Sequence, residues 1–168
     1  MKEKGLPHSK MKIYNLKIDV NSSFYNQLFR MALDFESRML FVVREKYKIR
    51  TEILKIIQPH IISIKKTQQW PGTISRGTSV DLYCCQITQD LVDELKILLP
   101  TLWSWMNPDF AEDISFVRGD GKSWFISITH EKDCYFILTD DEKKKADTYF
   151  GSESLSFQGP QEKSEKIY

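Results

Sequence analysis

The sequence has few cysteines and no long apolar run, and these absences exclude several classes of protein. Only three of the 168 residues are cysteine, Cys84, Cys85 and Cys134, which argues against a disulfide framework and favours a reducing compartment. No apolar run approaches the roughly 20 residues that a membrane-spanning helix needs. The basic residues of the first twelve positions are not followed by the apolar stretch of a secretory signal. We therefore expect a cytoplasmic protein with no membrane span.

Short motifs of the common catalytic and cofactor sites are also missing from the sequence. There is no Gly-x-x-x-x-Gly-Lys-Ser/Thr phosphate loop, no Gly-x-Gly-x-x-Gly run and no Gly-x-Ser-x-Gly nucleophile elbow. The cysteines and histidines do not show the spacing of a zinc site. We expect no cofactor and no metal, and a binding protein is favoured over an enzyme.

The composition is that of an ordinary globular chain whose charges are unevenly distributed. Hydrophobic residues make up 41% and charged residues 28%, and a chain of this length fits one domain. The net charge is only +1, yet residues 1–84 hold 15 basic and 7 acidic residues, whereas residues 85–168 hold 9 and 16. The halves could form two oppositely charged faces that steer a partner, or could interleave so that their fields cancel.

Hydrophobic periodicity predicts an α+β fold in a single domain over residues 1–151. We expect a mainly antiparallel sheet of five to seven strands, with three or four helices packed mostly on one face. The apolar run 38–45 is typical of a central strand that is buried on both faces. The expected strands are 12–20, 38–45, 61–65, 80–87, a hairpin over 113–130, and 134–138. The expected helices are 22–35, 51–57, 88–99 and 140–150.

The C-terminal part carries the clearest local signals. Asp120-Gly121 predicts the turn of a hairpin, and a second turn adds a third strand, which gives an antiparallel β-meander. Thr139 and Glu142 have the spacing of a capping box for the helix that follows. Residues 152–168 are polar and unpatterned, so we expect a mobile tail there.

A histidine and neighbouring charged residues offer one candidate catalytic site. His130 could act as a general base that Glu131 or Asp113 orients, with Arg118 binding an anionic substrate. Such a site would make the chain a small hydrolase, provided that the four side chains converge in one pocket. Adjacent residues on a strand point to opposite faces, so the simpler interpretation is that His130 ends a strand and Glu131 lies in a solvated turn.

The segment 107–113 is a second acidic region. Asp109, Glu112 and Asp113 could be brought near His130 or Asp120 by the sheet, to hold Mg²⁺ through oxygen ligands. The simpler interpretation is a turn whose side chains accept hydrogen bonds from local backbone amides. We adopt this second interpretation.

The loop 67–79 offers a candidate binding surface. Pro71-Gly72 fits a type II turn, and Trp70 beside it could either anchor the loop to the core or form a hot spot for a partner protein. Arg118 could pair with an acid or clamp an anion. We assign Trp70, Pro71, Gly72 and Arg118 as the candidate binding residues.

A basic and aromatic segment supplies a further alternative. Residues 44–50 place four cations around Tyr47, which suits phosphate contact with a ring available for stacking. A solvated connection between a strand and a helix needs the same residues. Weak nucleic-acid binding, which would depend on Lys46 and Lys48, is therefore the last of the alternatives.

Three stretches, 41–44 (FVVR), 70–73 (WPGT) and 112–133, resemble a group of small uncharacterised proteins from Bacillus-like bacteria. The resemblance implies a bacterial, cytoplasmic protein and transfers no catalytic residue. The missing motifs, the loop tryptophan and the charge asymmetry lead us to expect a non-catalytic cytosolic interaction protein. Its partner would be another protein, which it would serve as an inhibitor, immunity factor or regulator.

Overall fold

One large antiparallel sheet organises the molecule, which we describe from a computed structural model over residues 10–106 and 110–161. Within these ranges eight strands form this sheet, and two more form a separate hairpin. In spatial order the sheet contains β10 (Leu155–Pro160), β1 (Lys12–Leu16), β9 (Asp133–Leu138), β8 (Ser123–Ile128), β7 (Glu112–Val117), β2 (Arg38–Arg44), β6 (Val80–Gln86) and β3 (Ile61–Thr67). The hairpin consists of β4 (Gln69–Trp70) and β5 (Thr73–Ile74).

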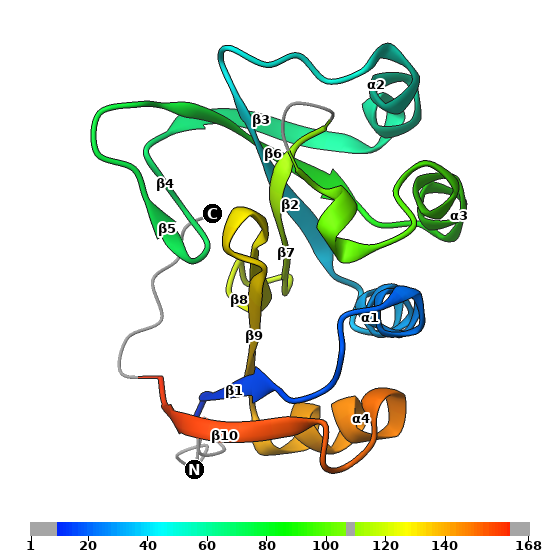
Figure 1. Ribbon diagram of the computed structural model, residues 1–168, viewed down its shortest axis with the longest axis vertical. Coiled ribbons are helices and arrows are strands. Elements are labelled where there is room, and N and C mark those ends of the chain that lie inside the picture. Colours follow the sequence, from blue (N-terminus) through cyan, green and yellow to red (C-terminus); the bar gives the residue numbers. More distant parts are fainter. Residues whose placement is uncertain (1–9, 107–109, 162–168) are drawn as a thin grey trace, which may run out of the picture.

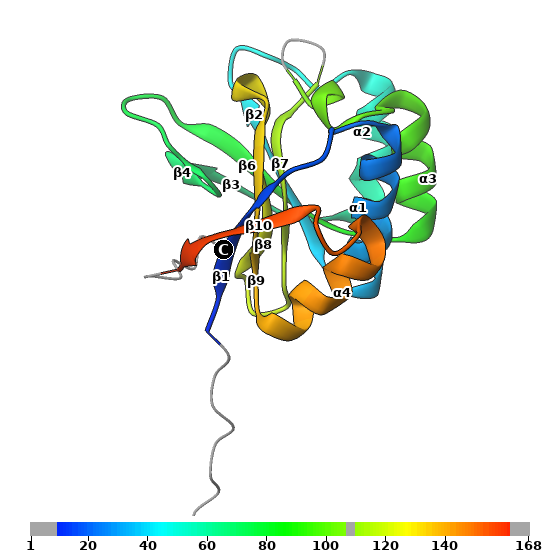
Figure 2. The ribbon, with the colours of Figure 1, turned by 60° about the horizontal axis from the view of Figure 1, so that its bottom comes forward.

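Within the described ranges, the four α-helices lie on the same side of this sheet (Figures 1 and 2). In the described ranges they are α1 (Ser22–Asp34), α2 (Thr51–Ile57), α3 (Gln89–Leu98) and α4 (Asp140–Phe150), with short 3-10 helices η1 (Gln58–His60), η2 (Leu102–Ser104) and η3 (Thr129–Glu131). The α+β class and the single helical layer are therefore confirmed. The sheet is larger than the expected five to seven strands.

Apolar periodicity explains why the helices cover one face. In α1 the buried residues Phe24, Leu28 and Met31 recur at helical spacing. The Asn21 side chain caps this helix by accepting the backbone amide of Phe24 at 3.0 Å. β2 is buried on both faces and lies between β7 and β6, as its continuous apolar run predicts.

Buried indole groups in the core have hydrogen-bond partners. Trp124 stacks on Phe116 with ring centroids 5.4 Å apart, and its indole N–H donates to the Ser37 hydroxyl at 2.8 Å. The indole N–H of Trp105 donates to the hydroxyl of Tyr25 at 2.7 Å. These bonds remove the cost of burying the two polar N–H groups.

The predicted C-terminal meander and its helix are confirmed. β7, β8 and β9 are successive neighbours in the sheet. The Thr139 hydroxyl accepts the Glu142 amide at 3.2 Å, and the Glu142 carboxylate accepts the Thr139 amide at 2.8 Å. Both halves of the capping box are therefore formed at the start of α4.

The prediction of a mobile tail from residue 152 is wrong for residues 155–160. These residues form β10, which pairs with β1 and extends the domain beyond residue 151. Leu155 is buried, and Phe157 contacts Tyr14 edge to face at 6.0 Å between ring centroids. A short edge strand has few buried positions, so its sequence shows almost no alternation. Residues 162–168 of the predicted tail lie outside the described residues.

The β4–β5 hairpin covers part of the sheet face opposite the helices, as Figure 2 shows. Trp70 joins Leu40, Val42 and Leu82 in a second apolar cluster on that face. At the hairpin turn Gly72 has a φ of +79°, and a Cβ there would lie 2.8 Å from Cγ2 of Ile126. The turn therefore needs glycine both for its backbone conformation and for its close approach to β8.

Substituting Gly72 tests whether the hairpin is docked on the sheet. We expect Gly72→Ala to lower the free energy of unfolding by about 2–3 kcal/mol, from positive-φ strain plus overpacking against Ile126. Gly77→Ala is the matched control, because Gly77 has a φ of +108° with nothing within 4 Å of an added Cβ. It should lose only about 1 kcal/mol. Equal losses for the two variants in urea unfolding would contradict the docked hairpin.

Candidate functional site

Glu112, Asp113 and His130 meet at one end of the β7–β8 hairpin. The two acids begin β7, and β8 returns alongside it to Ile128, just before η3. One potential ligand atom from each of the three side chains lies within 4.8 Å of the others. The fold thus brings together Asp113, His130 and the adjacent Glu131, three of the four residues considered for a hydrolase.

The prediction that His130 ends a strand is wrong. β8 ends at Ile128, and both residues belong to η3, where successive side chains are about 120° apart. The imidazole Nε2 lies 3.6 Å from the Glu131 carboxylate, and Nδ1 lies 4.0 Å from Asp113. Both separations exceed the usual length of a hydrogen bond.

The Asp113 carboxylate is the buried centre of this cluster. It accepts the indole N–H of Trp70 at 2.8 Å, the backbone amide of Thr129 at 2.9 Å and the Thr129 hydroxyl at 3.1 Å. The backbone amide of Asp113 donates to the Thr129 hydroxyl oxygen at 3.1 Å. Because Asp113 is only 1% exposed, these donors take the place of water around the carboxylate.

A β-bulge in β7 sets the direction of the Asp113 side chain. Leu40 pairs with Ser115 and Val42 with Glu112, so β7 has one extra residue opposite β2. Asp113 has a φ of 57°, a left-handed conformation that aspartate adopts more readily than most residues. Strand alternation does not reveal this bulge, so the contacts of Asp113 could not be found from the sequence.

A cleft of about 560 Å³ opens beside the cluster. The residues that line it are Arg44, Glu45, Lys46, Tyr47, Thr78, Glu112 and His130. Arg44 donates from Nε to the Glu112 carboxylate at 2.9 Å, and its guanidinium lies 6.0 Å from the centre of the Trp70 ring. The charged groups of Arg44 and Glu112 therefore neutralise each other within the cleft.

The polar groups of this cluster make hydrogen bonds and an ion pair within the domain. A carboxylate that orients a catalytic histidine lies within hydrogen-bond reach of it, whereas Asp113 lies 4.0 Å from His130. Glu112 faces a guanidinium, which already supplies the positive charge that a metal ion would bring. The magnesium alternative also included Asp109, which lies outside the described residues, and Asp120, which lies in the turn at the other end of β7.

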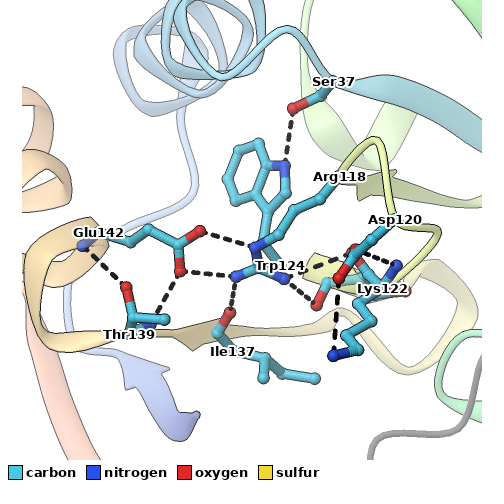
Figure 3. Close-up of polar contacts among 9 residues, drawn as sticks. Ser37, Arg118, Asp120, Lys122, Trp124, Ile137, Thr139 and Glu142 are labelled. Atoms are coloured by element: carbon cyan, nitrogen blue, oxygen red, sulfur yellow. Dashed lines mark hydrogen bonds and ion pairs between the residues drawn. The ribbon is translucent and has the colours of Figure 1, made fainter. Parts of the chain in front are cut away.

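Arg118 lies at that other end of β7 and anchors α4 (Figure 3). Its guanidinium donates to both oxygens of Glu142, at 2.6 and 2.7 Å, and to the carbonyls of Ser123 and Ile137 at 2.9 and 2.7 Å. Five residues of extended chain, roughly 17 Å, separate Arg118 from Asp113. The fold therefore does not bring Arg118 to the His130 cluster, and its donors are occupied within the domain.

The structure does not place Trp70 on the surface, where a hot spot for a partner would have to lie. Trp70 is 1% exposed and Pro71 is also buried, while Gly72 rests against Ile126. Of the two roles considered for Trp70, the structure shows the anchoring role. The indole is held by the apolar cluster on the open face of the sheet and by its bond to Asp113.

None of the three cysteines forms a disulfide in the described residues, and all three are buried. Burial raises the pKa of the Cys85 thiol to about 12, with a smaller contribution from Cys84. Burial, followed by the charge of Asp133, raises the pKa of Cys134 to about 12 as well. Both thiols are therefore protonated at neutral pH, which makes them poor nucleophiles.

Comparisons of the chain with protein-family models, with curated proteins and with solved structures gave no match. The resemblance to small proteins of Bacillus-like bacteria stays an expectation. In the described residues, no helix has the length and apolar character needed to cross a membrane.

Replacing Asp113 separates a structural role for the cluster from a catalytic one. We expect Asp113→Asn to lower the free energy of unfolding by about 3 kcal/mol, because the amide nitrogen would face a hydrogen-bond donor in a buried site. His130→Ala should cost less than about 0.5 kcal/mol, since the imidazole side chain is 48% exposed. Chemical unfolding followed by tryptophan fluorescence measures both. A His130 variant as unstable as the Asp113 variant would contradict the structural assignment.

Acid should weaken the Arg118–Glu142 contact. Burial alone would raise the pKa of Glu142, but hydrogen bonds from Arg118 and Thr139 and the Arg118 charge outweigh it and lower that pKa below the ordinary 4.5. The stabilisation is therefore complete above pH 4.5 and is lost as the pH falls through the lowered pKa. Glu142→Gln should cost about 2 kcal/mol at pH 7 and much less at pH 3.

Asp141→Asn provides the control for this pH dependence. Asp141 lies one position earlier in α4, pairs with Lys144, and its side chain is 87% exposed. We expect it to change stability by less than about 0.5 kcal/mol at either pH. If the cost of Glu142→Gln were the same at pH 3 and pH 7, the ion pair would not be the source of the stabilisation.

Proposed function

We propose that this chain is a non-catalytic interaction protein of the cytosol that binds another protein as an inhibitor, immunity factor or regulator. The observation that carries the proposal is the separation of charge along the sheet. The basic residues 38–86 and the acidic residues 110–161 lie toward opposite ends of the sheet. Such a surface steers an oppositely charged partner and selects against partners of like charge.

The two ends of the sheet come from different parts of the chain. Residues 38–86 build β2, α2, β3, the β4–β5 hairpin and β6, and they contain nine basic and three acidic residues. Residues 110–161 build β7 to β10 and α4, and they contain ten acidic and six basic residues. Figure 1 shows β3 and β6 at one end and β10 with α4 at the other. We call the end of the molecule built by residues 38–86 the basic end.

Exposed isoleucines accompany the positive charge at the basic end. Ile62 and Ile64 on β3 are 47% and 51% exposed, and Ile74 on β5 is 72% exposed. Apolar side chains among cations suit a protein partner, whose contact surface combines apolar and charged groups.

The acids of α3 confine the positive charge to part of the basic end. α3 packs against α2 and carries Asp90, Asp93 and Glu94. Their negative charges offset the positive charges on the side of the sheet that the helices cover. The remaining positive excess lies on β3 and in the loop 44–50.

The hydrolase alternative has weaker support. Asp113 and Glu112 form hydrogen bonds and an ion pair within the domain. Arg118, the proposed substrate clamp, is bound to Glu142 at the far end of β7. We therefore base the proposal on the charged surface and not on the His130 cluster.

Charge reversal at the basic end tests the proposal. The immobilised protein is mixed with nuclease-treated lysate of a Bacillus-like bacterium, and bound protein is cross-linked and identified. We expect the double variant Lys46→Glu/Lys48→Glu, in the exposed loop 44–50, to recover about tenfold less partner protein than the wild type. Capture by the wild type should also fall as the salt concentration rises.

The matched control reverses two lysines in the part of the molecule that holds β10 and α4. Lys17 follows β1 and Lys144 lies on α4, and both are exposed. Lys17→Glu/Lys144→Glu changes the net charge by the same amount and should leave capture unchanged. Equal capture by both double variants would contradict binding of a protein at the basic end, as would a protein that is captured from untreated lysate but not from nuclease-treated lysate.

A further inference from the structure

The two edge strands of the sheet differ in their suitability for pairing with another chain. β10 forms one edge and contains Gly159 and Pro160. Proline lacks the amide donor and glycine weakens a strand, so this edge is poorly suited to a further strand. β3 forms the other edge and contains neither residue.

The side chains of β3 form two chemically distinct faces. Ile64 pairs with Tyr83 on the helical face, and Lys65 pairs with Leu82 on the opposite face. Lys66 contacts Glu45 at 2.6 Å and Asp81 at 3.4 Å. Within the described residues, no acidic group lies within 4.0 Å of the Lys65 ammonium. Lys65 is exposed on the edge strand and can pair with an incoming acidic residue.

We propose that β3 is the edge at which the partner binds, through an extended acidic segment of the partner protein that adds to the sheet as a further strand. This inference rests on the proposed interaction function and names the element that carries it. Backbone hydrogen bonds along β3 would supply affinity, and alternate side chains would supply specificity. A carboxylate near Lys65 and an apolar side chain near Ile64 would match the two faces.

The charge of the basic end favours this occupant over a second copy of the chain. Pairing two β3 edges would bring together two regions that each hold nine basic and three acidic residues. Lysine on an edge strand is a common device against such self-association, because it places like charges together. The same lysines attract an acidic strand.

A synthetic peptide provides the direct test. The probe is a seven-residue peptide, the length of β3, that alternates glutamate with valine. Amide hydrogen exchange of the full chain is followed by NMR with and without the peptide. We expect outward-facing amides within residues 61–67 to exchange at least about tenfold more slowly in its presence. Lys65→Glu should weaken peptide binding about fivefold, and Lys144→Glu should leave it unchanged.

Two control peptides separate strand addition from simple charge attraction. An N-methylated peptide keeps every side chain but loses amide donors, so it should not protect β3. A lysine–valine peptide keeps the β propensity but reverses the charge, so it should not bind. Protection outside β3, equal protection by the N-methylated peptide or no binding of the glutamate–valine peptide would overturn the inference.

The peptide experiment tests the binding edge, and the lysate experiment tests the interaction function, so the two proposals can be contradicted separately. If the peptide does not protect β3 but charge reversal still abolishes capture of the partner, β3 is not the binding edge and the interaction function stands. If the peptide protects β3 but charge reversal leaves capture unchanged, the edge is competent and the proposed function fails.

Discussion

The buried carboxylate of Asp113 is the constraint on which the arrangement of the sheet's open face depends. A charge with 1% exposure is tolerated only when fixed donors replace water, and here Trp70 and Thr129 provide them. The bond to Trp70 ties the β4–β5 hairpin to β7, and the bonds to Thr129 tie the start of η3 to the same strand. One acidic side chain therefore joins segments that are far apart in the sequence.

Because Glu112 and Asp113 are engaged within the domain, we look for the functional surface elsewhere. Glu112 and Asp113 are close enough to His130 to resemble a catalytic or metal-binding group, but Arg44, Trp70 and Thr129 already contact their oxygens. The exposed surface offers more to a partner. At the basic end, cations and isoleucines lie on an edge strand that pairs on only one side within the described residues. The proposed interaction function follows from this contrast between internal and outward-facing polar groups.

Local signals in the sequence predicted most of the elements, and contacts between distant residues account for what they missed. The spacing of Phe24, Leu28 and Met31 and the capping box of α4 are short-range patterns, and both predicted helices are present. β10 was missed because its formation depends on pairing with β1 more than on any alternation of apolar and polar residues in its own sequence. Asp113 was considered as a catalytic residue, but its bond to Trp70 spans 43 positions and depends on a bulge. Glu142 was predicted as a cap, yet nothing local identifies Arg118 as its partner.

The exchange rate of the Trp70 indole N–H tests the central claim most directly, namely that Asp113 is engaged within the fold and not available for chemistry. Selective ¹⁵N labelling of the indoles resolves this proton by NMR in the unmodified protein. A buried N–H bonded to a carboxylate should exchange only when the hairpin opens, orders of magnitude more slowly than an indole in water. Exchange as fast as that of a solvent-exposed indole would show that the Trp70 N–H is not hydrogen-bonded to the Asp113 carboxylate. The claim that Asp113 is engaged within the fold would then be wrong.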